Sequence, residues 1–363
     1  MTIRGADVYR ETGIEARKGE VDFGRGGPRA MAHRPDHARS RSSRKMTARS
    51  SLVTRPPFHL EATVRVLQRR PSNAVDVWDD GRYQRVLALP QGLALLEVKD
   101  FGTTDRPDVR FFIRAGDTSS ATRLAVRCAL RKMLGLDIDP APLQRLAERD
   151  RAFRDTAFAL RGMRPPRFAG LFETFASVVP FQQLSLEAGV AIVARLVAKF
   201  GQSLKYKGRR FCAFPTAQAI AEARLAPLRA CGLSARKAQT LRDLARAVES
   251  RAVTEEELSG MSTHEALAAL TQLPGIGPWS AAVVLLRGLG RIDVFPPGDV
   301  GAMRGLRALM HLGPHAPLDP LIERFGQNRG YLYFCALGGS LLSKGLIGSA
   351  LSSPNLKWEG RKR

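Results

Sequence analysis

The sequence predicts an α+β protein that is mainly helical, in which a small antiparallel β-sheet domain with a packed helix precedes a helical bundle. Between residues 58 and 114, short segments alternate apolar and polar residues, as do antiparallel strands with one buried face. Beyond residue 138, apolar residues recur three and four positions apart, which is the helical period. A chain of 363 residues is also long enough for two domains.

The sheet domain is predicted over residues 51–137. Its expected strands are HLEATVRVL, RYQRVLALP, GLALLEVKD and DVRFFIR, which are separated by turn clusters such as PSN and DDG. The run SSATRLAVRCALRKML at 119–134 is predicted to be a helix whose apolar stripe covers the buried face of the sheet.

The helical domain is predicted over residues 138–350. The expected helices contain PLQRLAERD, RFAGLFETFASVV, LEAGVAIVARLVAKF, ARKAQTLRDLARAVE and HEALAALTQL. Ser234 and either Ser262 or Thr263 are expected to cap helix N-termini, and Gly201 and Gly232 are expected at helix ends.

The two ends of the chain differ in composition from this folded part. Residues 1–50 are rich in Arg, Gly, Ser and His and are predicted to be disordered, and residues 351–363 form a second basic tail. Alternatively, translation begins at Met46.

The first fifty residues carry ten Arg and two Lys against six acidic residues, a net charge of +6, which leaves +17 of the total +23 elsewhere. Such an excess favours a polyanionic partner, and nucleic acid is the first to consider.

Several classes of function are not indicated. The four cysteines form no CxxC pair, the six histidines form no HxH or HExxH pattern, and no P-loop is present, so no cofactor and no side-chain metal site is expected. The apolar stretch YLYFCALGGSLL at 331–342 is too short to span a bilayer. No secretory signal is evident, and a cytoplasmic location is expected.

The stretch LPGIGPWSAAVVLLRGLGRIDVFPPGDVG at 273–301 contains the most informative pattern. It predicts a glycine hairpin between two helices, then a short strand-like run and a lone carboxylate, Asp299. Gly275 and Gly277 allow a tight turn, and its amides, beside a helix begun by Pro278, could hold a phosphate. The alternative is an αα-hairpin without a ligand. A dinucleotide site is not indicated, because the third glycine and a preceding strand are missing.

The whole stretch resembles the helix-hairpin-helix, Gly/Pro-rich loop and aspartate of the base-excision DNA glycosylase superfamily, and in particular its alkylbase (DNA-3-methyladenine glycosylase II) branch. The resemblance extends through FHLEATVRVLQRRPSNAVDVWDDGRYQRVL, PFQQLSLEAG, FPTAQAIA and CGLSARKA, so it covers most of residues 58–345. It implies a helix-hairpin-helix glycosylase bundle and a monomer that binds double-stranded DNA, flips an alkylated purine out of the stack and hydrolyses its N-glycosidic bond.

By this resemblance Asp299 is the catalytic carboxylate. Breaking an N-glycosidic bond develops oxocarbenium character on the sugar, which a fixed anion stabilises, while the same carboxylate can orient or deprotonate the attacking water. A helix N-cap is the alternative role for Asp299, and the two roles can coexist.

Trp279 stands where lyase-competent relatives carry a nucleophilic lysine, so the resemblance implies a monofunctional hydrolase that leaves an abasic site. In the alkylbase branch this tryptophan lies beside the base pocket, where its face attracts a cationic purine; core packing is the alternative. Tyr331 and Tyr333 could add aromatic surface to the pocket. At Leu337 family members can carry a pocket tryptophan, so this chain departs from the pattern there.

PFQQLSLEAG at 180–189 resembles the loop that enters the minor groove. Leu184 is at the position of the apolar wedge and Gln183 beside it is assigned to the pocket; alternatively, Leu184 begins the apolar face of the next helix. The other predicted DNA-binding residues are Leu273, Gly275, Ile276, Gly277, Arg236 and Lys237. The carbonyls of Leu273 and Ile276 could also hold a monovalent cation, as hairpins of this superfamily usually do. The basic run LKYKGRRF at 204–211 is more typical of a solvated loop than of a phosphate site.

Two rival functions stay open at this point. A non-catalytic DNA-binding protein could use the same hairpin for phosphate contact alone, although it would have no need of Asp299. A bifunctional glycosylase/lyase for oxidised bases would need the lysine that Trp279 replaces. The favoured prediction is base excision repair of alkylated DNA, with association to the nucleoid through DNA binding.

Overall fold

The protein was analysed as a computed structural model that describes residues 50–142, 144–145 and 151–348. The chain divides into the compact units Met1–Arg44 and Lys45–Arg363, and all described residues belong to the second. The basic tail 351–363 and the segment predicted to be disordered, apart from Ser50, lie outside the described residues.

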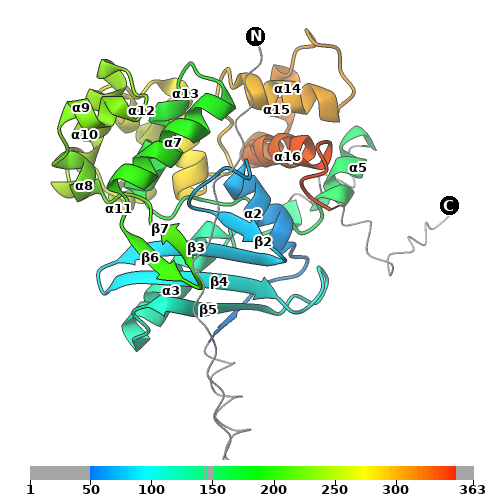
Figure 1. Ribbon diagram of the computed structural model, residues 1–363. Coiled ribbons are helices and arrows are strands. Elements are labelled where there is room, and N and C mark those ends of the chain that lie inside the picture. The colour runs from blue at the N-terminus through cyan, green and yellow to red at the C-terminus, as the bar shows by residue number, and fades with distance from the viewer. Residues whose placement is uncertain (1–49, 143, 146–150, 349–363) are drawn as a thin grey trace, which may run out of the picture. The chain divides into compact units, whose positions relative to one another are not determined.

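The N-terminal part of the second unit contains a five-stranded antiparallel sheet (Figure 1). Its order is β1-β5-β4-β3-β2, with β1 at Ser51–Leu52, β2 at Val77–Asp79, β3 at Arg82–Leu89, β4 at Gly92–Asp100 and β5 at Val109–Gly116. The predicted strands at RYQRVLALP, GLALLEVKD and DVRFFIR are confirmed as β3, β4 and β5. The short edge strands β1 and β2 carry no comparable alternation and were not predicted.

The prediction of a strand at HLEATVRVL is wrong, because this segment forms helix α2 (Leu60–Gln68). The ring nitrogen Nδ1 of His59 accepts a hydrogen bond from the amide of Ala62 at 2.9 Å and so caps the helix. Within the helix only Glu61 and Arg65 are not buried, and they lie four residues apart on one face. Alternating polarity resembled a strand here because the helix is buried on nearly all its other sides.

Both faces of the sheet are covered, whereas one buried face was predicted. Helix α3 (Ser120–Met133) packs on one face, as expected, through Val126, Leu130 and Met133. The opposite face meets the hairpin of β6 (Ser203–Tyr206) and β7 (Arg209–Cys212), where Phe211 packs against Val86 and Leu95. The basic run at 204–211 is therefore a hairpin, which turns at Lys207 and Gly208 with φ of 47° and 75°.

The rest of the described chain consists of helices and the loops between them, as predicted, while most of the predicted helix PLQRLAERD lies outside the described residues. The helices are α5 (Arg151–Ala159), α6 (Leu171–Ala176), the short turn η1 (Val179–Phe181), α7 (Leu186–Phe200), α8 (Ala217–Ala221), α9 (Leu225–Ala230), α10 (Ala235–Glu249), α11 (Glu255–Gly260), α12 (Thr263–Thr271), α13 (Pro278–Val284), the π-helical turn η2 (Leu285–Leu289), α14 (Val300–Leu309), α15 (Asp319–Arg324), the short turn η3 (Gly326–Asn328) and α16 (Arg329–Leu342). The Ser234 and Ser262 caps are confirmed, and Ser262 forms a capping box with Glu265. The strand-like run before Asp299 forms no strand.

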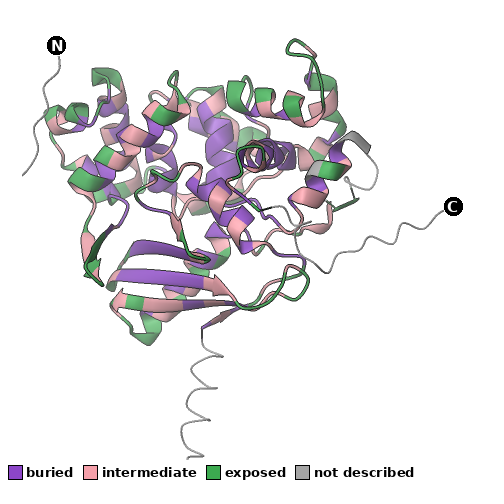
Figure 2. Cartoon of the chain, turned by 45° about the vertical axis from the view of Figure 1, so that its right-hand side comes forward, coloured by how far each residue is buried: buried purple, intermediate pink, exposed green. Residues whose placement is uncertain are grey.

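Helix α16 lies in the largest apolar core and is buried along most of its length. Figure 2 shows buried residues concentrated in the central helices and in the middle of the strands. Helix α2 contributes Ala62 and Val66 to this core and Val64 and Leu67 to the core of the sheet, so it packs against both parts. The division of the second unit near residue 137 stays a prediction. None of the described helices is long and apolar enough to cross a membrane.

A buried group of charges connects the sheet to helix α6. Arg85 of β3 donates to Asp76 Oδ1 at 2.7 Å and to Glu173 Oε2, and the hydroxyl of Tyr83 donates to the same oxygen of Asp76 at 2.7 Å. Burial raises the pKa of Glu173 and, together with Asp76, that of Tyr83. Because a buried charge is costly unless it is paired, the carboxylates of Asp76 and Glu173 depend on the positive charge of Arg85.

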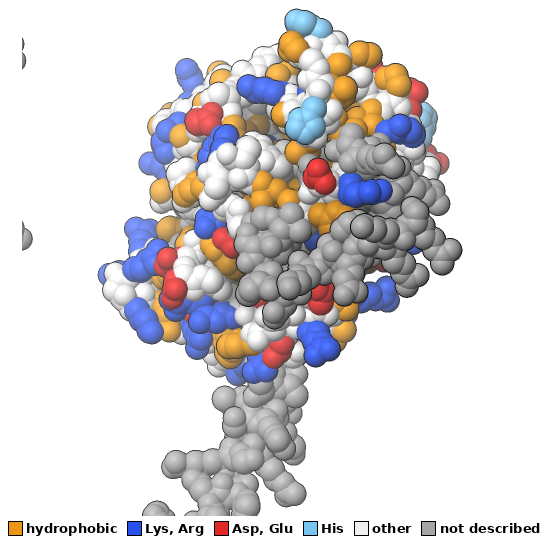
Figure 3. Space-filling model, turned by 90° about the vertical axis from the view of Figure 1, so that its right-hand side faces the viewer, with side chains coloured by type: hydrophobic (Ala, Val, Ile, Leu, Met, Phe, Trp, Pro, Cys, Tyr) orange, Lys and Arg blue, Asp and Glu red, His pale blue; other side chains and the backbone are white. Residues whose placement is uncertain are grey.

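Charged side chains elsewhere are mixed in sign. On the face shown in Figure 3, Lys and Arg are interspersed with Asp and Glu over the lower half, where the sheet lies. On this face the positive excess is therefore not gathered into a single patch.

Candidate active site

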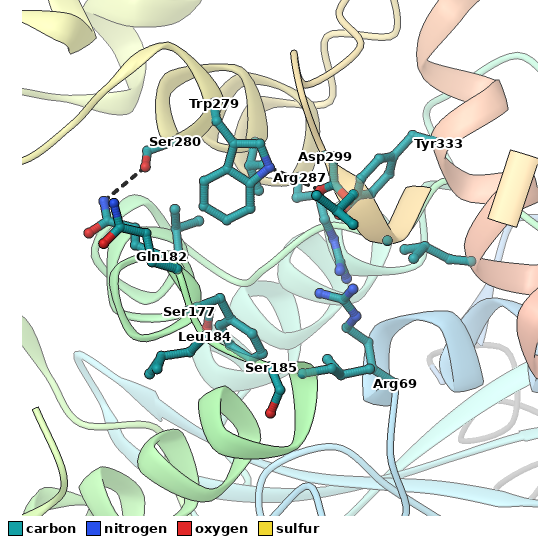
Figure 4. Close-up of a pocket in the computed structure, with 18 of the residues that line it drawn as sticks. Arg69, Ser177, Gln182, Leu184, Ser185, Trp279, Ser280, Arg287, Asp299 and Tyr333 are labelled. Carbon is teal, nitrogen blue, oxygen red and sulfur yellow. Dashed lines mark hydrogen bonds between the residues drawn. The ribbon is translucent and has the colours of Figure 1, made fainter. Parts of the chain in front are cut away.

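A cavity of about 1420 Å³ brings together most of the residues singled out in the sequence. Its walls come from the loop between η1 and α7, the start of α10, the hairpin before α13, the loop before α14, and α16 (Figure 4). The charged residues of the lining are Asp299, Glu187, Arg69, Arg70, Arg236, Lys237, Arg287, Arg304 and Lys344. Glu187 is paired with Arg70 at 2.8 Å, so Asp299 is a lone carboxylate in basic surroundings.

Asp299 is held by two hydrogen bonds, one on each carboxylate oxygen. Its Oδ1 accepts from the amide of Ala302 at 2.8 Å, which makes it the N-cap of α14, and its Oδ2 accepts from the indole Nε1 of Trp279 at 3.0 Å. The capping role is therefore confirmed. Because both donors are fixed by packed helices, the carboxylate is oriented before any ligand arrives.

The hairpin at Leu273–Gly277 joins α12 to α13. Gly275 has a φ of 78°, and a Cβ there would lie 2.5 Å from Thr240 Oγ1, so this turn requires glycine. Gly277 is exposed, and a Cβ there would contact nothing within 4 Å, so a ligand's backbone has room to approach. The side chain of Ile276 is buried, which leaves only its main chain for binding.

The hairpin carbonyls fit a hard monovalent cation as oxygen donors. The Leu273 carbonyl accepts the turn hydrogen bond from Ile276 at 3.1 Å and keeps a second lone pair, and a cation site there stays a prediction. Across the described residues, no group of three or more His, Cys, Asp or Glu is placed to hold a metal ion.

The loop before α7 faces the cavity. Leu184 is 45% exposed and precedes the cap Ser185, so the alternative that it begins the apolar face of α7 is wrong. Gln183 is also exposed, lines the cavity and adopts a left-handed φ of 55°. Gln182 ties the loop to the hairpin, since its Nε2 donates to the carbonyl of Gly275 at 2.8 Å and to Ser280 Oγ at 2.9 Å. Figure 4 places Leu184 across the cavity from Trp279.

Lys237 and Arg236 begin α10, next to this loop. Arg236 is exposed and lines the cavity. The ammonium of Lys237 donates to the carbonyls of Gln182 at 2.5 Å and Pro180 at 3.3 Å, and burial lowers its pKa. Two of its three N–H groups thus hold the loop that carries Leu184, and one is left for another acceptor.

The aromatic lining differs from the prediction at one position. Tyr331 does not line the cavity, because its ring is buried and its hydroxyl donates to the carbonyl of Asp139 at 2.5 Å. Tyr333, two residues along α16, lines it instead and makes edge-to-face contacts with Phe295 and Phe334. Trp279 is half-buried, lines the cavity and also packs against a neighbouring apolar core. Leu337 lines the cavity as well.

Comparison with known families agrees with this geometry. Residues 176–323 match the family described as HhH-GPD superfamily base excision DNA repair protein, and residues 49–169 match the AlkA N-terminal domain. The chain belongs to the HhH-GPD superfamily. The hairpin, Trp279 and Asp299 all lie within the segment 176–323 that matches this superfamily.

Similar proteins carry related names. The chain is 30% identical, over 69% of its length and 48% of theirs, to Mycobacterium tuberculosis proteins named "Probable bifunctional transcriptional activator/DNA repair enzyme AlkA". It therefore spans about half the length of these relatives. It is 24% identical to the DNA-3-methyladenine glycosylase of Bacillus subtilis, over 75% of this chain and 90% of that protein. The solved 3-methyladenine DNA-glycosylase of Archaeoglobus fulgidus superposes with a TM-score of 0.67 at 28% identity, over 81% of this chain and 99% of that one.

Sequence reasoning missed three features of this HhH-GPD cavity. The Gln182 contacts with the hairpin and the Lys237 contacts with the loop join residues far apart in the chain, so no local pattern signals them. Arg287 was missed because it lies in an apolar helical run, where a single arginine suggests solvent exposure. That one charge in an otherwise apolar run was the available signal.

Proposed function

We propose that this protein is a monofunctional DNA glycosylase that removes alkylated purines from double-stranded DNA by hydrolysing the N-glycosidic bond. The observation that carries the proposal is Asp299, oriented by Trp279 and Ala302 at the edge of a cavity beside the superfamily's hairpin. The names of the similar proteins from Bacillus subtilis and Archaeoglobus fulgidus support alkylated bases as substrates. The proposal includes action as a monomer and association with the nucleoid through DNA.

DNA would be held and opened by two neighbouring elements. The open hairpin at Gly277 is suited to a phosphate, since no side chain there blocks the approach of the DNA backbone. The exposed Leu184 is suited to fill the gap left by a flipped base, as apolar wedges do. Gln182 connects the two elements and would fix the distance between the hairpin, which contacts the DNA backbone, and the wedge Leu184.

The chemistry would centre on Asp299. Its negative charge stabilises the oxocarbenium character that develops on the sugar as the base departs, and its oxygens can orient water for attack. An N-alkylated purine carries positive charge and leaves without a protonated acid. The electron-rich faces of Trp279 and Tyr333 favour such a base.

The direct test is excision from duplexes that contain 7-methylguanine or 3-methyladenine, followed by treatment with alkali. We expect strand breaks only after alkali, because the enzyme would leave an intact abasic site. Borohydride is expected to trap no covalent complex, since Trp279 replaces the nucleophilic lysine. A trapped complex that disappears in Lys344→Met would instead show a lyase that uses the lysine on the cavity rim.

Lys237→Met is expected to lower the excision rate more than the affinity for undamaged DNA. The substitution keeps a long apolar stem but removes the bonds to the carbonyls of Gln182 and Pro180, so the loop that carries Leu184 loosens. A loss of about tenfold in single-turnover rate is expected, because misplaced positioning elements have effects of this order or more. Arg236→Met is the matched control, since it removes an exposed neighbouring charge without a bond to the loop. The positioning role of Lys237 would be contradicted if both variants lowered the affinity for DNA equally and neither lowered the single-turnover excision rate.

A further inference from the structure

The basic hairpin of β6 and β7 has no role in the proposed function. It lies in a stretch, residues 188–221, that contains no Asp or Glu and carries the basic residues Arg195, Lys199, Lys205, Lys207, Arg209 and Arg210. The last four of these belong to the β6–β7 hairpin, and all four are exposed. Positive charge is therefore concentrated in this part of the chain.

The β6–β7 hairpin is a packed ribbon rather than a solvated loop. Leu204, Tyr206 and Phe211 belong to the apolar cluster on the face of the sheet. Arg209 is directed to the sheet as well, since its Nη1 lies 3.2 Å from Oδ2 of Asp79. One face of the ribbon is thus fixed on the sheet, and the alternate side chains of both strands point outward.

The outward side of the ribbon carries charge that no ion pair within the described part of the chain neutralises. Lys205 and Arg210 are direct cross-strand partners, and like charges directly opposite each other destabilise a pair of strands. Arg210 Nε donates to Ser203 Oγ at 3.0 Å, a neutral acceptor. Lys207 adds a third charge at the turn, with its ammonium 5.6 Å from the centre of the Tyr206 ring. A ligand with several negative charges would relieve this repulsion.

The β6–β7 hairpin is also separate from the cavity. Helix α7 begins at the cavity, where Leu186 and Glu187 line it, but no later residue of α7 is among the lining residues. The helix has 15 residues and is about 22 Å long, and the hairpin follows its far end, below α7 and over the sheet in Figure 1. Because duplex DNA is stiff over such a length, a duplex seated at Leu184 would reach the hairpin only if sharply bent.

We propose that the outward side of the β6–β7 hairpin binds the backbone of a second segment of double-stranded DNA while the cavity holds the first. Lys205, Lys207 and Arg210 contact phosphates, and such contacts do not depend on base sequence. The inference goes beyond the proposed function and takes from it that the cavity binds duplex DNA. With two sites the protein passes directly between segments, because the second segment is bound before the first is released.

The test measures how fast the protein leaves a short fluorescent duplex with an abasic-site analogue as unlabelled, undamaged duplex is added. We expect the dissociation rate of the wild type to rise with the competitor concentration, and that of Lys205→Gln/Lys207→Gln/Arg210→Gln not to depend on it. Three phosphate contacts predict a slope of about −2.7 for the logarithm of the affinity for the second duplex against the logarithm of the salt concentration. Single-turnover excision of 7-methylguanine should stay near the wild-type rate, since the hairpin does not line the cavity.

Two further variants separate DNA binding from net charge and from stability. Arg131→Gln/Arg224→Gln/Arg251→Gln removes the same charge from exposed positions outside the hairpin and the cavity, and should keep the dependence on competitor. Lys205→Glu places an opposite charge across from Arg210, so it should unfold at a higher urea concentration than the wild type. The same variant should lose most of the dependence on competitor, a combination that a purely structural role does not produce.

Three results would overturn the inference. They are a wild-type dissociation rate that does not change with competitor, equal losses in the two triple variants, and stronger acceleration by RNA than by duplex DNA at the same phosphate concentration. Failure of the wild type to excise 7-methylguanine would overturn the proposed function alone, because the dissociation measurement requires DNA binding and no catalysis.

Discussion

Asp299→Asn is expected to lower the excision of alkylated purines by a factor on the order of 10³ while the protein stays folded. Asparagine caps a helix about as well as aspartate, so the bond from the Ala302 amide is kept. Its amide nitrogen must then face the indole N–H of Trp279, which loses its acceptor, at a cost of about 1 kcal/mol in the free energy of unfolding. Single-turnover excision and urea unfolding measure the two effects separately.

Asp293→Asn provides the matched control for this charge. Asp293 lies six residues earlier, accepts a hydrogen bond from Thr263 Oγ1 at 2.5 Å and does not line the cavity. Its variant removes the same negative charge near the same hairpin and should keep excision near the wild-type rate. Near wild-type excision by Asp299→Asn would remove this carboxylate from the mechanism.

The parts of the site that are local in sequence could be predicted. Gly275, Gly277, Trp279 and Asp299 lie within 25 consecutive residues, and the turn, the helix and the cap follow from their neighbours in the chain. Tyr331 was assigned to the pocket wrongly, because on an almost fully buried helix the pattern does not show which ring faces a cavity.

The parts that depend on packing at a distance could not be predicted. Helix α2 was taken for a strand because it is buried on both sides, by the sheet core and by the α16 core, and burial on several sides removes the helical period from the sequence. The hairpin at 204–211 covers the sheet through Phe211, with Leu204 and Tyr206 packed against the same cluster, and the basic neighbours of these residues hide the apolar face in the sequence. The ammonium of Lys237 likewise donates its hydrogen bonds to carbonyls more than fifty residues away in the sequence, which no local pattern reveals.

Arg85→Met is expected to lower the free energy of unfolding by about 3–5 kcal/mol. Asp76 and Glu173 would both stay buried without their cation, and burial already raises the pKa of Glu173. Urea unfolding at neutral pH measures the loss. Arg209→Met, which breaks the exposed pair with Asp79 at 3.2 Å, is the control and should cost less than about 1 kcal/mol.

The same buried group bears on the active site through helix α6. Glu173 is followed by Thr174, whose Oγ1 lies so close to Gly288 that a Cβ on that glycine would come within 2.9 Å of it. Gly288 is the next residue after Arg287, so a shift of α6 would be passed to the turn that holds this guanidinium. Combining Arg85→Met with Asp76→Asn and Glu173→Gln removes the unpaired charges and should restore part of the stability. If stability returns and the single-turnover rate of 7-methylguanine excision does not, the buried group positions the turn at Arg287 as well as stabilising the fold. Recovery of both would assign it to stability alone.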